Sequence, residues 1–356
     1  MNYNGFVTGG AEYIRGLIAE AVENGSRTAT VSGEYIIDDA VRLPSDFTLI
    51  LEDCHLVMAP GVYSNMFVNE HHGTDIGKTE RGADRNISII GRGRAILDGG
   101  EYNGLSERNQ LTDGRPPIWK NNLVLFTNVR GFKLSGLHCR NQRWWALNFL
   151  YCRDGYIGNI DFLASDIGID ENGNEYHGLM RERYDEVLVK NADGVDIRCG
   201  CRDIVIENIT GFTEDDTVAI TGLYGGVESE FAVCGVPSDI HNITVRNIRS
   251  SAFCTIVRML NQSGVKLYDV TVDGVYDTSR EMPQLDHGLY AVRLGDVRLY
   301  GTRHATKDET YNITVRNVFG RSDYAVSLAG DMRDVTVYGI ECADGCKMLL
   351  DERVSE

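Results

Sequence analysis

The chain has 356 residues, with 35 Lys and Arg against 52 Asp and Glu and a formal charge of -17 at neutral pH. This acidic balance argues against nucleic acid and anionic membranes as partners, although a local arginine cluster can still receive an anionic substrate. No apolar run approaches the roughly 18 residues that a membrane span needs, and the N-terminal segment does not resemble a signal peptide. We therefore expect a cytoplasmic protein, or a secreted one if a leader has been removed.

An amphipathic helix is expected at the N-terminus, over residues 10–25. Its apolar side chains fall on one helical face, at Ile14, Leu17, Ile18, Ala21 and Val22. Gly25 ends the run. Such a helix would cover the apolar end and the open edge of the structure that follows it.

A short pattern then recurs along the chain: apolar, any, apolar, any, then Asn, Asp or Gly, then apolar. The Asn, Asp or Gly anchors of this pattern are Gly91, Gly136, Asn159, Asn208, Asn247, Asp269, Asn317 and Gly339. Most gaps between them equal one or two periods of about 22 to 24 residues, which is typical of a solenoid.

The alternation within each repeat has a period of two, so the repeats are strands rather than helices. A unit of this length holds three short strands and three turns, and Asn suits a recurring turn because it tolerates the left-handed conformation. The sequence therefore predicts an all-β fold, a single-stranded right-handed parallel β-helix capped by the N-terminal helix. No linker interrupts residues 1–356, so one domain is expected.

A polar insertion over residues 165–186 breaks the repeat. Long loops on such a scaffold usually form the wall of a binding cleft. His177 and Arg181 within it are candidate substrate-binding residues, with a solvated loop as the alternative. Its acidic and amide residues only partly match a calcium loop, so no metal or cofactor is predicted.

Two acidic motifs follow, NADGVDI at 191–197 and EDDTVAI at 214–220. Asp193 and Asp215 are 22 residues apart, so we expect them to stack on adjacent coils about 4.8 Å apart. Neighbouring coils could supply the two carboxyl groups of an inverting glycosidase, which lie about 6.5–9.5 Å apart. Crowding would keep one of them protonated near neutrality. A solvated turn whose carboxylates cap local N–H groups is the alternative.

These motifs resemble those of the polygalacturonase family of glycoside hydrolases (family 28), within the pectin-lyase-like β-helix superfamily. NADGVDI resembles the family's Asn-Thr-Asp-Gly-x-Asp, and EDDTVAI resembles its Gly/Gln-Asp-Asp-Cys-x-Ala-Ile. The predicted cap helix and the segment GRGRAILDGG also look like the family's opening coils. The resemblance implies that Asp193, Asp215 and Asp216 are catalytic, with Asp215 as the general acid and the other two holding the water.

The chain departs from the family pattern at two places. The family's Gly-His-Gly is missing, and the nearest histidine, His241, is the only candidate substitute. The family's Arg-x-Lys, which binds the uronate carboxylate, is reduced to Arg258, because Leu260 occupies the lysine position. Arg258 could bind a carboxylate in two-pronged fashion, or form a salt bridge with the aspartates. The lost lysine suggests a different or a neutral sugar.

Three functions remain open. The first is cofactor-free inverting hydrolysis of a plant-derived oligosaccharide, with or without uronates, by a polygalacturonase-type enzyme. The second is a β-helix polysaccharide lyase or epimerase, which would use a base and commonly calcium. The third is a carbohydrate-binding solenoid without activity. Homo-oligomers could also form through the flanks of the solenoid.

Overall fold

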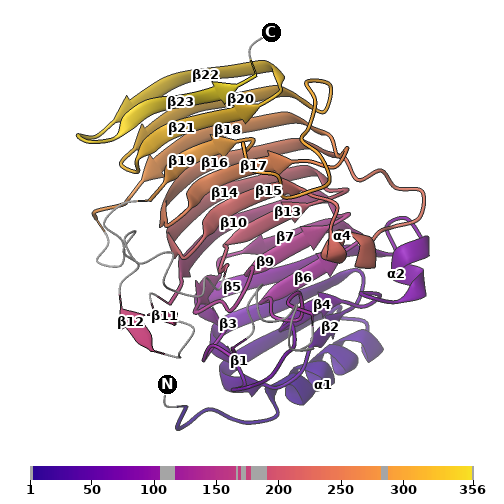
Figure 1. Cartoon of the computed structure of the whole chain (residues 1–356). Coiled ribbons are helices and arrows are strands. Elements are labelled where there is room, and N and C mark those ends of the chain that lie inside the picture. The colour runs from indigo at the N-terminus through magenta and orange to yellow at the C-terminus, as the bar shows by residue number, and fades with distance from the viewer. Residues whose placement is uncertain are drawn as a thin grey trace.

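The computed structural model describes residues 3–104, 117–165, 167–169, 174–177, 191–281 and 288–354. The chain winds into a right-handed parallel β-helix, as the repeat predicts (Figure 1). Its coils stack from the N-terminal helix to the C-terminal strands, with the helix at one end of the stack. None of the helices found in the described residues is both long and apolar enough to cross a membrane.

Two parallel sheets run the length of the solenoid. The larger sheet contains β1 (Thr28–Ile37), β3 (Phe47–Met58), β5 (Asp84–Asp98), β7 (Val129–Ser135), β8 (His138–Arg140), β10 (Arg153–Leu163), β14 (Arg202–Thr213), β16 (Ile240–Ala252), β18 (Leu267–Asp277), β20 (Thr310–Gly320) and β22 (Arg333–Cys342). The smaller sheet contains β2 (Val41–Leu43), β4 (Phe67–Asn69), β6 (Val124–Thr127), β9 (Leu147–Leu150), β13 (Val195–Arg198), β15 (Asp216–Gly222), β17 (Thr255–Asn261), β19 (Tyr290–Leu294), β21 (Tyr324–Gly330) and β23 (Lys347–Arg353).

Left-handed residues divide the strands of the larger sheet, so each coil has three strand segments, as predicted. Asn159, Asn208, Asn247 and Asn317 have φ between 53° and 56°. The amide of Asn208 donates to Asn159 of the preceding coil at 3.0 Å. Asn fits because it adopts this conformation at low cost and hydrogen-bonds to the next coil.

One predicted anchor is wrong. Tyr268 pairs with His241, so Asp269 aligns with Asn242 rather than with Asn247. The true anchor of that coil is Gly274, at φ 81°. Each coil has two left-handed positions with similar flanking patterns, and the sequence pattern selected the earlier one here.

Gly91 is an anchor for a different reason. It is not among the left-handed residues of the described chain, but a Cβ built on it would lie 2.0 Å from the carbonyl oxygen of Gly136 on the next coil. Close approach of two coils therefore requires glycine at this position.

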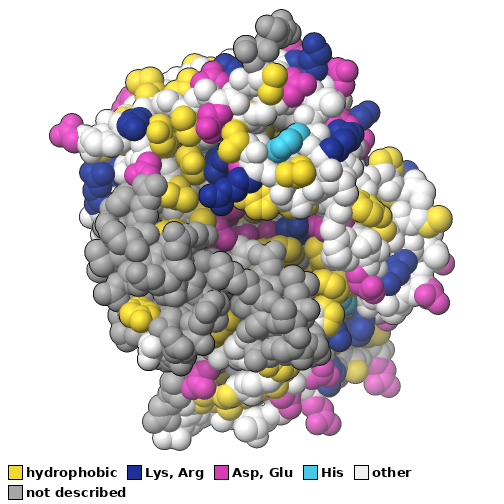
Figure 2. All heavy atoms as spheres, viewed as in Figure 1, with side chains coloured by type: hydrophobic (Ala, Val, Ile, Leu, Met, Phe, Trp, Pro, Cys, Tyr) yellow, Lys and Arg dark blue, Asp and Glu magenta, His cyan; other side chains and the backbone are white. Residues whose placement is uncertain are grey.

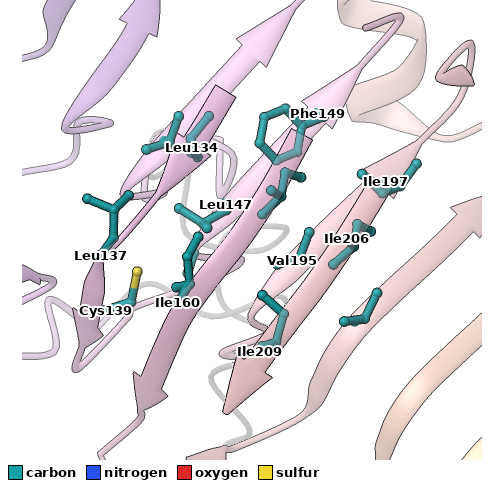
Figure 3. Close-up of a cluster of buried hydrophobic side chains, with 14 of the residues drawn as sticks. Leu134, Leu137, Cys139, Leu147, Phe149, Ile160, Val195, Ile197, Ile206 and Ile209 are labelled. Carbon is teal, nitrogen blue, oxygen red and sulfur yellow. The ribbon is translucent and has the colours of Figure 1, made fainter. Parts of the chain in front are cut away.

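The inward-facing side chains of both sheets form one continuous core. Figure 3 shows part of it, where Leu147, Phe149, Val195 and Ile197 face residues of the larger sheet such as Ile206. Burying each such side chain contributes about 1.5–3 kcal/mol. All nine cysteines are free, and five of them are buried, as expected for reduced cysteines.

Helix α1 (Gly10–Glu23) closes the N-terminal end. Ile14, Ile18 and Ala21 are buried against the first coils, and Leu17 and Val22 pack against the core from its edge. The predicted cap is confirmed. Two further helices in the described chain, α2 (Asp75–Thr79) and α4 (Gly226–Glu230), lie in connections between strands.

The described strands within residues 165–186 lie outside the two parallel sheets. They form an antiparallel pair, β11 (Ile167–Ile169) with β12 (Glu175–His177). The position of the rest of this insertion, including Arg181, lies outside the described residues.

Candidate active site

The predicted carboxylates meet on the outer face of the smaller sheet. Asp193 lies just before β13, and Asp216 begins β15 on the next coil. The amide N–H of Asp216 donates to Asp193 Oδ1 at 2.9 Å, and the Gly194 N–H donates to the Asp216 carbonyl at 2.9 Å. Figure 2 shows a recess in the middle of this face, with acidic and basic side chains at its floor.

The stacking differs from the expected one by one residue. Val195 pairs with Val218, which places Asp193 beside Asp216 rather than beside Asp215. One oxygen each of Asp193, Asp215 and Asp216 still lie within 4.8 Å of one another. The cluster therefore forms, but these oxygens are closer than the 6.5–9.5 Å carboxyl separation expected for an inverting pair.

Burial and crowding raise the pKa of these acids. Burial is the main reason that the pKa of Asp193 is well above its ordinary value, followed by the charges of the neighbouring aspartates. The pKa of Asp216 is raised in the same way, by burial and then by the charge of Asp215, and is lowered in part by Arg258 and Thr255. A raised pKa favours the protonated form of a carboxyl group, which is the form that a general acid requires.

Asp196 is a fourth member of the cluster that the sequence interpretation did not assign. It is 0% exposed, and neither carboxylate oxygen has a hydrogen-bond partner. Burial raises its pKa to about 8, although Arg198 opposes the shift. Asp196 is the last acid of the NADGVDI motif, and strict alternation with inward-facing Val195 and Ile197 could have assigned it to the outer face.

Arg198 connects the cluster to the segment between β15 and β16. Its guanidinium donates from Nε to Glu228 Oε1 at 2.7 Å, lies 3.6 Å from Asp196 Oδ1, and stacks 3.9 Å from the centre of the Trp145 ring. Glu228 belongs to α4, and its other oxygen accepts from the Gly225 N–H at 3.0 Å.

Arg258 forms a salt bridge, as the alternative to substrate binding suggested. Its partner is Asp296 rather than an aspartate of the cluster. Its guanidinium donates to Asp296 Oδ2 at 2.6 Å and to the Gly295 carbonyl at 2.7 Å. The side chain is 9% exposed, and its charge lowers the pKa of Asp216. Arg258 thus acts electrostatically on the cluster. Leu260, in the lysine position, is 5% exposed.

His241 is not part of this site, so its assignment as a substrate-binding residue is wrong. It pairs with Arg202 at the start of β14, whereas the strand reaches the aspartates only after Thr213. Its ring stacks on Tyr268 of the larger sheet, with centroids 4.7 Å apart. His241 therefore lies level with the start of β14, whereas the cluster follows the end of that strand. For His177 the structure describes only the backbone, paired with Ile167.

Two groups of described residues have the ligand spacing of a metal site. One is the cluster of Asp193, Asp215 and Asp216, whose hard oxygen ligands suit a cation such as Ca²⁺. The other is Glu70, His71 and Asp84. There, Asp84 already accepts from the His71 ring at 2.7 Å and from the Asn69 amide at 2.6 Å, so a structural role accounts for it.

The fold is a right-handed parallel β-helix that presents a cluster of aspartates on the outer face of its smaller sheet. Among solved structures, the chain is similar to an exopolygalacturonase from Thermotoga maritima, with a TM-score of 0.52 and 13% identity over 96% of this chain and 87% of that one. It is also similar to a polygalacturonase from Erwinia carotovora, with a TM-score of 0.51 and 12% identity over 92% and 89%.

A third similar structure is a tailspike protein of E. coli bacteriophage HK620 in complex with a pentasaccharide. The TM-score is 0.57 and the identity 15%, over 97% of this chain and 62% of the tailspike chain. No protein-family model and no curated protein matches the chain. At these identities the similarities establish the shared fold, and the chemistry has to be argued from the site.

Proposed function

We propose that the protein is a glycoside hydrolase that cleaves an oligosaccharide with its aspartate cluster. The observation that supports this most is the meeting of Asp193, Asp215 and Asp216, with oxygens within 4.8 Å, on adjacent coils of one face. Burial and neighbouring charges raise the pKa of Asp193 and Asp216, which favours the protonated form of these acids. Polygalacturonases among the structural neighbours support the same class of reaction.

In this proposal Asp215 protonates the leaving glycosidic oxygen, and the ionised member of the Asp193 and Asp216 pair takes a proton from the attacking water while the other holds the water in place. The bond between the anomeric carbon and the leaving oxygen breaks as the water oxygen attacks from the opposite face, which inverts the anomeric centre. No cofactor enters these steps. A plant-derived substrate and a cytoplasmic location remain predictions from the sequence.

The close spacing of the carboxylate oxygens supports an alternative outcome, in which the anomeric configuration is retained. Carboxyl groups about 5–5.5 Å apart are typical of retaining glycosidases, in which one carboxylate attacks the anomeric carbon and water later releases the sugar. The anomer formed first, followed by proton NMR before mutarotation, distinguishes the two. The inverted anomer supports the proposal, and the retained anomer would make Asp193 or Asp216 a nucleophile.

The reaction class is tested by incubating the protein with acidic and neutral plant oligosaccharides beside the Asp215→Asn variant. Released reducing ends that are lost in the variant are the expected result. Ultraviolet absorbance from an unsaturated product would instead identify a lyase, and its dependence on Ca²⁺ would assign the cluster to a metal. Tight saccharide binding without turnover in the wild type would make the protein a binding solenoid.

A further inference from the structure

Two half-buried cysteines, Cys342 and Cys346, flank the turn that joins the last two strands at the C-terminal end of the stack (Figure 1). Cys342 is the final residue of β22, and Cys346 immediately precedes β23. The Cys346 N–H donates to the Ala343 carbonyl at 3.1 Å, which closes the turn. A closed turn of this size reverses the chain within a few residues, so it brings the two cysteines together.

Both cysteines lie over Gly320 of the preceding coil. Cys342 pairs with Gly320 in the register of β20 and β22. A Cβ built on Gly320 would lie only 2.9 Å from the Cys346 Sγ atom, so the glycine leaves room for this sulfur. Both side chains pack against the edge of the core. The pKa of Cys346 is raised to about 12, first by burial and then by the Cys342 thiol, an effect that requires the two thiols to be neighbours.

A second pair of neighbouring cysteines in the described chain differs from this one in its access to solvent. Cys152 and Cys201 also interact through their thiols, but both are 0% exposed. Their sulfur atoms donate to the carbonyls of Phe126 at 3.4 Å and Phe149 at 3.3 Å. A dissolved oxidant reaches a partly exposed thiol and not a fully buried one. Of the two pairs, only Cys342 and Cys346 are therefore open to modification.

The charged groups around the turn favour one order of reaction. Arg280 donates from Nη1 to the Asp344 carbonyl at 3.0 Å, and its charge lowers the pKa of Cys346. Burial, Cys342 and Asp277 outweigh this effect, so Cys346 keeps its proton near neutral pH. Because the thiolate is the nucleophile, the first attack on an oxidant is assigned to Cys342, and Cys346 acts second.

We propose that Cys342 and Cys346 are a redox modification site that a low-molecular-weight disulfide, such as oxidised glutathione, converts into a disulfide. Cys342 attacks one sulfur of oxidised glutathione, whose disulfide bond breaks, and one reduced glutathione leaves with the proton of Cys342. Cys346 then attacks the Cys342 sulfur of the mixed disulfide, and the second reduced glutathione leaves with the proton of Cys346. Two electrons pass from the two thiols to oxidised glutathione, and excess reduced glutathione reverses the reaction.

The disulfide would constrain the coil that has the least support. In the described chain, β22 pairs only with β20, and β23 pairs only with β21, because these strands are the last of their sheets. A covalent link across the turn between them restricts local opening of this coil. The modification does not depend on the proposed hydrolysis, since the aspartate cluster lies several coils away, at β13 and β15.

The site is tested by incubating the folded protein with oxidised glutathione, blocking the remaining thiols with iodoacetamide and mapping the peptides without reduction. We expect the wild type to gain a link between Cys342 and Cys346, with the loss of two hydrogen atoms, and to lose it in excess reduced glutathione. Cys346→Ser should stop at a glutathione adduct on Cys342. Cys152 and Cys201 of the same sample, both labelled only after unfolding, are the internal control. Amide hydrogen exchange in β22 and β23 should slow by about 3-fold or more on oxidation.

Iodoacetamide on both Cys342 and Cys346 of the treated wild type would overturn the site, as would a glutathione adduct that persists there without forming the link. A link between Cys152 and Cys201 that forms equally fast would contradict the argument from exposure. An adduct on Cys346 in Cys342→Ser, without one on Cys342 in Cys346→Ser, would reverse the assigned order. Unchanged amide exchange in the linked protein would contradict the constraint on the last coil.

Discussion

The outer faces of the two sheets use acidic residues in opposite ways. On the larger sheet, Glu207 pairs with Arg246 and accepts from the Tyr156 hydroxyl at 2.9 Å, and these contacts lower its pKa. Asp273 lies 2.8 Å from Arg316, which likewise lowers the pKa of that carboxyl. These acids lie at the surface and are charged at neutral pH.

On the smaller sheet the acids are buried and crowded, and the pKa values of Asp193, Asp196 and Asp216 are raised. The nearby cations are committed elsewhere, Arg198 to Glu228 and Arg258 to Asp296. On one solenoid, carboxylates that contact solvent and a cation of their own therefore have lowered pKa values, whereas those that are buried without such a cation have raised pKa values and can take part in acid–base chemistry.

Removing the proposed acid should have the largest effect. We expect Asp215→Asn to lower kcat by about 10²- to 10⁴-fold, because a positioned general acid contributes that much. Glu207→Gln on the larger sheet is the control and should retain full activity. Reducing-end release and circular dichroism check both variants. Equal activity in the two proteins would remove Asp215 from the mechanism.

Breaking the buried ion pair comes next. Arg198→Met leaves Glu228 buried without its cation, so we expect a loss of about 3–5 kcal/mol in the free energy of unfolding. The double variant Arg198→Met with Glu228→Gln should recover most of this loss. Urea unfolding measures both. A double variant as unstable as the single one would show that the arginine acts through packing on Trp145.

The stability of the folded chain should depend on Asp196. Because its folded pKa, about 8, exceeds the ordinary value of 3.8, the native protein holds a proton that the unfolded chain has released. The free energy of unfolding therefore falls as the pH rises between these values. Asp196→Asn should reduce this fall and raise the thermal midpoint at pH 8. An unchanged pH dependence in differential scanning calorimetry would contradict the assignment.

Substitutions in the stacked asparagines of the larger sheet, such as Asn159 and Asn208, should lower the free energy of unfolding by less. Asn208→Ala removes the hydrogen bond that the Asn208 side-chain amide donates to Asn159, and it places alanine in a left-handed conformation. We therefore expect a loss of about 1–3 kcal/mol in the free energy of unfolding. Asn208→Gly keeps the conformation at low cost and isolates the amide contribution. Identical losses in the two variants, measured in urea, would show that the backbone conformation is not a source of stability.

The smallest effect is expected at the exposed ion pair of the larger sheet. The Arg246 side chain is 56% exposed, and such pairs contribute about 0–1 kcal/mol. Arg246→Ala should therefore leave urea unfolding and activity nearly unchanged. A loss of unfolding free energy as large as that of Arg198→Met would contradict the distinction between the exposed ion pairs of the larger sheet and the buried ones of the smaller sheet.

The fold could be predicted from the sequence because every coil repeats the same requirement. Alternating Ile and Val form the core, and Asn or Gly turns the chain at a fixed place, as at Asn208 and Gly339. Asp269 was misassigned because two left-handed positions in each coil share one local pattern. Local sequence does not distinguish them, whereas the register with the neighbouring coil does.

The candidate site could be predicted only where its residues lie in one motif. Asp193, Asp215 and Asp216 come together because their motifs begin or precede adjacent strands of one sheet. The pairing of Arg258 with Asp296 joins residues 38 positions apart, and burial of Glu228 depends on how α4 packs. Neither contact has a sequence pattern, because both are made by connections outside the repeat.

The most direct test is a carbon-13 NMR titration of the aspartate carboxyl groups in the wild-type protein, assigned with single Asp→Asn variants. The account predicts that Asp193, Asp196 and Asp216 lose their protons above the ordinary range of an aspartate, Asp196 at about pH 8, while Asp273 of the larger sheet loses its proton below that range. If all four carboxyl groups lose their protons together near pH 4, the account of a proton-retaining catalytic face is contradicted.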